Sequence, residues 1–241
     1  MCAFIGIASV SLVTACDLAS SRPATSPTTT TSASSNPPPT SSPATSPSAS
    51  AGVYGDPVAA AKFWRQQSLD DNCGLVSVAD VVGEITGNEP TEQQMVALAQ
   101  NTPSGTNPGP IYAPSSDPSH ASGNGGVEMA DLVVLLDHYG IKSLMAWTAH
   151  PEQTGMPALQ QYLTDNRKII AWVNSAIIWN TGDQHTKADH YLVVSGIDTN
   201  TQIVHLNDPG TDHADEQVPI ATFTNAWQTG EESIVVTAAA S

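Results

Sequence analysis

The spacing of apolar and polar positions changes near the middle of the chain. In the first half of the region after residue 52, apolar side chains recur three and four residues apart, as they do on one face of a helix. Leu75, Val78 and Val82 follow this spacing. Gly87 is a typical helix end. The periodicity predicts helices over residues 73–86, 91–100, 127–139, 157–166 and 219–227.

Short apolar runs dominate the second half and predict strands. The sequence DTNT at 198–201 is typical of a turn, so the runs on either side of it are expected to pair antiparallel. Residues 101–126 are rich in Pro, Gly and Ser, which predicts a long irregular loop. The expected strands are 142–148, 169–173, 190–196, 203–208 and 233–237. Because helices precede most strands, we expect an α+β fold with an N-terminal helical part packed on an antiparallel β-sheet.

The N-terminus has the pattern of an exported protein. Residues 1–16 hold an apolar run that is too short to span a bilayer and suits a signal peptide, although no Lys or Arg precedes it. The run ends in Val13-Thr14-Ala15-Cys16, which resembles a bacterial lipobox, so Cys16 is the expected lipidation site. We therefore expect an extracytoplasmic, membrane-anchored lipoprotein, with a plainly secreted protein as the alternative.

A polar linker and a single folded domain are expected to follow. Residues 17–52 are mostly Ser, Thr, Pro and Ala, a composition that predicts a disordered stalk. Residues 53–241 are long enough for one domain with a substantial core. The formal net charge of −16 argues against nucleic acid or an anionic membrane surface as a partner, because both are polyanions.

The cysteines point to candidate chemistry in the domain. The chain has three, and Cys2 and Cys16 fall in the signal region, so Cys73 is unpaired in the mature domain. An unpaired cysteine is either a small buried hydrophobe or a nucleophile. Cys73 begins a predicted helix that Asp71 or Asn72 is expected to cap, which would aim the positive end of the helix dipole at its sulfur.

A cysteine nucleophile needs a histidine base that a third group orients. Of the seven histidines, His190 is the best placed because it opens an apolar strand after a polar loop. The partner strand ends in Asn207-Asp208, and alternation puts these two side chains on opposite faces. Only one of them can therefore orient His190, with Asp208 the first candidate and Asn207 the second.

Together these segments resemble the bacteriocin-processing, double-glycine cysteine peptidase family of the papain-like clan. The matching features, in the family's order, are a glutamine six residues before the cysteine, DNCG at 71–74, HYLVVSG at 190–196 and NDP at 207–209. KIIAWV at 168–173 also resembles the family strand that precedes the histidine strand. The likeness covers about residues 63–237 and implies a papain-like cysteine peptidase fold. The resemblance does not imply that this protein cleaves its substrate after a double glycine.

The resemblance implies a role for four residues. Cys73 matches the nucleophile, His190 the general base and acid, Asp208 the orienting acid, and Gln67 the side chain that helps form the oxyanion hole. Gln66 is the alternative for the last role because it sits beside Gln67. The expected reaction is hydrolysis of a peptide or protein substrate through an acyl-enzyme, with no cofactor and no metal.

Three other functions compete with a peptidase. The same triad can serve an amidase or transferase that acts on cell-wall peptides. A non-catalytic surface-binding module on a stalk would need no reactive thiol. A metal site is the third, with Asp183, His185, Asp189 and His190 as ligands, although these lack the spacing of a zinc-binding helix.

Overall fold

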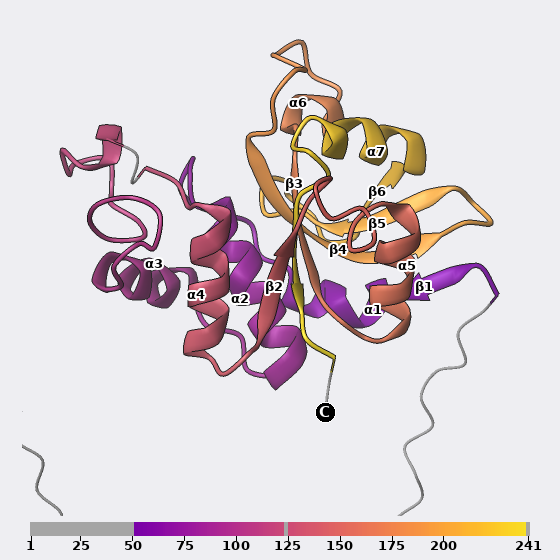
Figure 1. Ribbon diagram of the computed structural model, residues 1–241, viewed down its shortest axis with the longest axis horizontal. Coiled ribbons are helices and arrows are strands. Elements are labelled where there is room, and N and C mark those ends of the chain that lie inside the picture. The colour runs from indigo at the N-terminus through magenta and orange to yellow at the C-terminus, as the bar shows by residue number, and fades with distance from the viewer. Residues whose placement is uncertain (1–50, 123–124, 240–241) are drawn as a thin grey trace, which may run out of the picture. The chain divides into compact units, whose positions relative to one another are not determined.

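The computed structural model describes residues 51–122 and 125–239 (Figure 1). The predicted signal peptide, Cys16 and nearly all of the predicted linker lie outside the described residues. Ala51 and Gly52, at the end of that linker, contact the turn after the fourth strand through Asn200 and Thr199. No helix among the described residues has the length and apolarity needed to cross a membrane.

Seven strands form one sheet in which all neighbours are antiparallel. The order is β2-β7-β3-β4-β5-β6, and β1 pairs with β4. The strands are β1 Val53–Gly55, β2 Ser143–Ala146, β3 Ile169–Val173, β4 His190–Asp198, β5 Ile203–Asn207, β6 Glu216–Pro219 and β7 Ile234–Thr237. The predicted hairpin is confirmed, since β4 and β5 pair across the turn in which Asp198 accepts the Asn200 amide.

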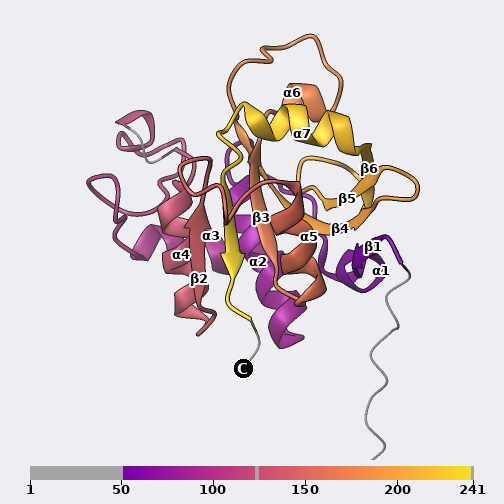
Figure 2. The same ribbon diagram turned by 45° about the vertical axis from the view of Figure 1, so that its right-hand side comes forward.

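Helices cover both faces of this sheet. They are α1 Pro57–Ala60, α2 Cys73–Thr86, α3 Glu92–Asn101, α4 Met129–His138, α5 Met156–Thr164, α6 Ser175–Ile178 and α7 Ile220–Gln228, with 3-10 turns at Ala61–Phe63 and His120–Ser122. Figures 1 and 2 show α3 and α4 on one side of the described region and α5, α6 and α7 on the other. The α+β class is therefore confirmed, with α5–α7 as a further layer.

Two apolar cores result from the alternation of side chains along the central strands. Ile169, Ala171 and Val173 of β3 belong to the core under α5, α6 and α7. Ile170 belongs to the core that holds α2, α3 and α4. Because β3 and β4 are buried on both faces, they form a rigid platform at the start of β4, where His190 lies.

Helix α2 brings the candidate nucleophile onto this platform. Cys73 through Gly83 are all buried, and Gly87 ends the helix in the left-handed conformation, as its position in the sequence predicts. Gly83 permits close packing, because a Cβ there would lie 2.6 Å from the Phe63 ring. At the start of α3, Thr91 and Gln94 form a capping box, in which each side chain accepts from the backbone N–H of the other residue.

Four short elements are absent from the sequence-based prediction. They are β1, α1, α6 and β6, each three or four residues long. The start of α1 has a readable signal, since Asp56 caps it and Pro57 occupies its first position. Strand β6 has no apolar period of its own and forms by pairing with β5. This matters for the site, because β6 and α6 both contact it.

Candidate active site

Cys73 is the first residue of α2 and lies against the start of β4. Its sulfur is 3.4 Å from the backbone nitrogen of Tyr191, which donates to it. The side chain is 8% exposed, so the sulfur has little contact with bulk water. Its place in the first helical turn puts it near the free N–H groups and the positive end of the helix dipole, both of which attract negative charge.

The residues before Cys73 do not cap α2 with their side chains, contrary to the prediction. Asn72 occupies the N-cap position but forms no capping hydrogen bond, and its Nδ2 donates instead to Glu92 Oε1 at 2.7 Å. Asp71 Oδ1 accepts from the Tyr112 hydroxyl at 2.9 Å, and its Oδ2 lies 3.4 Å from His120 Nε2. Both side chains therefore hold neighbouring segments rather than the helix end.

His190 and Asp208 form a short, buried pair. His190 Nε2 lies 2.6 Å from Asp208 Oδ1, and the two residues are 4% and 0% exposed. Trp179 completes the surroundings, because its ring meets the His190 ring edge-on at 5.1 Å and its Nε1 donates to Asp208 Oδ2 at 2.9 Å. With Nε2 bonded to Asp208, the other ring nitrogen of His190 remains for the cysteine side.

The electrostatics of the pair favour a charged imidazolium. Burial lowers the pKa of His190, but the Asp208 carboxylate and Cys73 outweigh it and raise that pKa to about 10. Burial raises the pKa of Asp208, but the imidazolium, the Gly210 amide and the Trp179 N–H outweigh it and hold that pKa below its usual value. The Cys73 thiol, which interacts with His190, therefore lies next to a group that is positively charged at neutral pH.

The structure distinguishes the two candidates for the third group. The Asp208 carboxylate contacts the His190 ring, whereas the Asn207 side chain bonds to other groups and not to His190. Its Nδ2 donates to the Ala60 carbonyl at 2.9 Å and to Asp80 Oδ2 at 2.8 Å. Asn207 therefore ties β5 to α1 and α2.

The two glutamines also occupy different environments. Gln66 is exposed and lines a hollow next to Arg65 and Glu89. Gln67 is half-buried, and its backbone nitrogen donates to the Pro209 carbonyl at 2.9 Å, next to Asp208. Its side-chain Nε2 donates to the Leu69 carbonyl at 2.7 Å. The Nε2 group has a second hydrogen, and an oxyanion role for Gln67 requires that hydrogen, or the amide after rotation away from Leu69, to reach the substrate.

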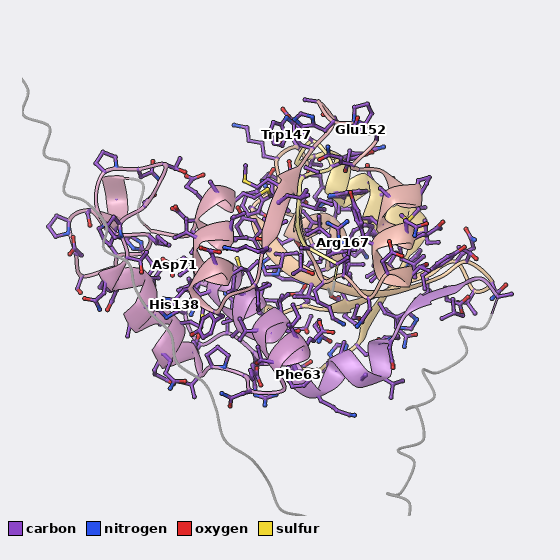
Figure 3. The ribbon with its side chains drawn as sticks, turned by 60° about the horizontal axis from the view of Figure 1, so that its bottom comes forward. Phe63, Asp71, His138, Trp147, Glu152 and Arg167 are labelled. Carbon is purple, nitrogen blue, oxygen red and sulfur yellow. The ribbon has the colours of Figure 1, made fainter. Side chains whose placement is uncertain are left out.

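A cleft with a volume of about 490 Å³ opens over Cys73 and His190. Trp172, Val127 and Met129 supply apolar walls. The acidic side chains are Asp70, Asp71, Glu128 and Asp189. Trp147, by contrast, lies on the loop after β2, apart from Asp71 (Figure 3).

The competing metal ligands do not assemble. His185 Nε2 bonds the Thr181 carbonyl, Asp189 accepts from Ser175 N and Gln184, and His190 pairs with Asp208. Within residues 51–122 and 125–239, no group of three or more His, Cys, Asp or Glu side chains has the geometry of a metal site. The donors proposed from the sequence therefore have other partners.

Several residues at the site escape sequence reasoning. Trp179 and Glu216 both contact Asp208, yet one ends α6 and the other begins β6, the short elements that the sequence does not reveal. His120 is half-buried against Asp71. These contacts depend on tertiary placement, and no local pattern in the sequence marks them.

The fold is that of papain-like cysteine peptidases, and the comparisons agree. Residues 58–234 match the family model described as Peptidase C39-like. The chain belongs to this family. Uncharacterized proteins of Mycobacterium tuberculosis and Mycobacterium bovis are each 44% identical over 201 residues, covering 78% of this chain and 86% of theirs. A crystal structure of a protein from Bacillus anthracis, described as a C39-like peptidase, is 19% identical with a TM-score of 0.50 and covers 74% of this chain and 94% of that one. This likeness supports the fold.

Proposed function

We propose that this protein is a cysteine peptidase that hydrolyses peptide bonds with Cys73 as nucleophile and His190 as general base and acid. One observation carries the proposal. The Cys73 sulfur lies at a helix N-terminus, in a cleft that it shares with His190, and the His190 ring is held by a fully buried Asp208. Family membership supports the same chemistry.

In the proposed mechanism the resting site is a thiolate and imidazolium pair. The thiolate attacks the peptide carbonyl and forms a C–S bond, and the carbonyl oxygen becomes an oxyanion. The backbone N–H of Cys73 and the Gln67 amide stabilise that oxyanion, each donor typically contributing about 3–4 kcal/mol. His190 then gives its proton to the leaving amine as the C–N bond breaks. Neutral His190 next deprotonates a water that attacks the thioester, which releases the acid and restores the thiolate.

We further propose that the domain works outside the cytoplasm, held to a membrane by a lipid on Cys16. The lipobox-like sequence at 13–16 and the Ser/Thr/Pro-rich segment after it support this location. The substrate is then a peptide or protein within reach of the membrane surface.

The direct test of the function compares the wild-type chain with Cys73→Ser on two substrate sets, a proteome-derived peptide library and a cell-wall digest, both read by mass spectrometry. New peptide termini in the library, absent with Cys73→Ser, support a peptidase. Products only from the cell-wall digest would indicate an amidase or transferase that uses the same residues. Binding to cell-wall material or peptides that Cys73→Ser leaves intact, with no products from either set, would indicate a binding module instead.

A further inference from the structure

The buried carboxylate of Asp208 has one acceptor position that its three donors leave open. Oδ1 accepts from His190 Nε2 and from the Gly210 amide, both at 2.6 Å, and Oδ2 accepts from Trp179 Nε1 at 2.9 Å. A carboxylate offers about four lone-pair sites on its two oxygens. Asp208 is 0% exposed, so bulk water does not reach the remaining site on Oδ2.

The Glu216 carboxyl is placed to fill that position. Glu216 opens β6 directly opposite Leu206 of β5, and Asp208 follows two residues after Leu206. The two carboxyl groups lie within hydrogen-bonding reach of each other. Glu216 Oε2 is buried, and no donor among the described residues hydrogen-bonds to it. Two ionised carboxylates in contact repel each other, and a proton between them removes the conflict.

We propose that Glu216 is a positioning residue whose protonated carboxyl donates a hydrogen bond to Asp208 and thereby fixes the carboxylate that orients His190. The inference rests on the proposed function, in which the His190–Asp208 pair serves Cys73. It adds a fourth group behind the triad that never touches the substrate.

The charge environment agrees with a neutral Glu216. Burial and the negative charge of Asp208 raise the pKa of Glu216 to about 8, although the His190 imidazolium acts in the opposite direction. His185, from the loop after α6, lines the same hollow of about 670 Å³ as Glu216 and bonds the Thr181 carbonyl. Helix α7, packed against β6, carries no ionisable side chain. The hollow gives Glu216 a route for proton exchange that fully buried Asp208 lacks.

Loss of the Glu216 proton should therefore disturb the site as the pH rises through about 8. Asp208 then loses a donor and gains a like charge beside it, so its hold on the His190 ring loosens. Because small displacements in a catalytic constellation are costly, hydrolysis should fall by roughly 10- to 100-fold when the donor is removed at neutral pH.

The test follows the His190 N–H proton, which a short bond to a carboxylate moves far downfield in a proton NMR spectrum. Spectra of the full-length protein are recorded from pH 6 to pH 10 for wild type, Glu216→Gln and Glu216→Ala, with Gln217→Ala as the neighbouring exposed control. Glutamine keeps an N–H donor but cannot ionise. Hydrolysis of the peptide library is measured in parallel.

The proposal predicts a shift of the wild-type resonance with a midpoint near pH 8, and the same behaviour in Gln217→Ala. In Glu216→Gln the His190 N–H resonance persists but no longer shifts with this midpoint. Peptide hydrolysis by Glu216→Gln exceeds peptide hydrolysis by Glu216→Ala. A step at an unchanged midpoint in Glu216→Gln would overturn the proposal, whether or not Glu216→Ala folds. Because the resonance needs no substrate, absence of peptide hydrolysis in every sample contradicts the proposed function and leaves this test standing.

Discussion

The placement of single side chains decides what Cys73 and His190 can do. Asp208 is the central residue, because its carboxylate takes bonds from His190, Trp179 and the Gly210 amide while fully buried. The sequence indicates His190 and Asp208 because both lie at strand ends within recognisable motifs. It gives no sign that Glu216 or Trp179 contacts Asp208, since these contacts form only after distant segments pack together.

Replacement of Asp208 by asparagine should abolish the proposed hydrolysis while it keeps a side chain of nearly the same size at this position. The amide cannot accept from all the donors that face it, so the His190 ring loses its orientation and its charge support. We expect kcat for peptide hydrolysis to fall at least about 100-fold. Asp212→Asn is the matched control, because the Asp212 side chain is 88% exposed and pairs only with His213 among the described residues. Equal activity of both variants would contradict the role of Asp208.

The His190–Asp208 pair should make the free energy of unfolding depend on pH. The raised pKa of His190 stabilises the fold below its ordinary value of 6.5, and this contribution is lost as the pH rises through about 10. The lowered pKa of Asp208 stabilises the fold above its ordinary value of 3.8, and this contribution is lost as the pH falls further. The difference in unfolding free energy between wild type and Asp208→Asn should therefore be largest at about pH 4 to 6.5. Urea unfolding across the pH range measures it, and a difference independent of pH would contradict the pairing.

At the scale of elements, the site is assembled where β4, β5 and the loop after α6 converge on the N-terminus of α2. The loop after β5 is tightly constrained there. A Cβ on Gly210 would lie 2.4 Å from Trp179 Cζ2 and 2.9 Å from its Cη2. Only glycine therefore lets this loop pass beneath the indole that donates to Asp208.

Gly210→Ala should push Trp179 away from Asp208. The fractional loss of peptide hydrolysis should exceed the fractional loss of unfolding free energy. We expect a loss of activity of roughly 10-fold or more from misalignment of the pair. Gly182→Ala is the control, since a Cβ there meets no atom within 4 Å. Peptide hydrolysis and the melting temperature are measured for both. A Gly210→Ala variant as active as Gly182→Ala would show that the indole does not position Asp208.

The described part of the loop 101–126 is held at the cleft by a second set of contacts. Tyr112, 2% exposed, donates its hydroxyl to Asp71, and His120 Nδ1 contacts the Ala113 carbonyl while its Nε2 lies near Asp71. Asp71 in turn lines the cleft over Cys73. The sequence predicts this segment as a loop, and its composition gives no sign of where it docks.

Tyr112→Phe should free the loop while costing the domain only about 1 kcal/mol of unfolding free energy, the usual contribution of one hydrogen bond. Amide exchange over the described part of the loop should become faster, and the KM of peptide hydrolysis should rise more than kcat falls. Tyr54→Phe, on β1, is the control for loss of a phenol hydroxyl. Unchanged exchange in Tyr112→Phe would show that the hydroxyl does not anchor the loop.

At the scale of the whole molecule, the long elements are predictable and the short ones are not. The period of apolar residues predicts α2, α3, β3 and the β4–β5 hairpin, because each buries its own stripe of side chains. The elements α6 and β6 are only four residues long and are stabilised by neighbours rather than by their own pattern. For the same reason the motif residues could be proposed from the sequence, whereas the groups that hold them could not.

The anchoring of the protein gives a prediction at this scale. Cys16→Ser should move the protein from the membrane fraction to the soluble fraction of the bacterium, because the lipid has no sulfur to join. The activity of the purified domain should remain, since residue 16 lies outside the domain that carries the site. Fractionation with mass spectrometry of the N-terminal peptide tests this. An unmodified N-terminal peptide in the wild-type membrane fraction would contradict lipidation.

The central claim, a thiolate at Cys73 maintained by His190, is tested most directly by the rate at which iodoacetamide alkylates Cys73 at pH 6. Site-resolved mass spectrometry separates this cysteine from Cys2 and Cys16 in wild type and His190→Ala. A free thiol with a pKa of about 8.5 is less than about 1% ionised at pH 6. The account predicts that wild-type Cys73 reacts at least about 10-fold faster than such a thiol. It also predicts that His190→Ala reacts no faster than that thiol. Equal rates in wild type and His190→Ala would contradict it.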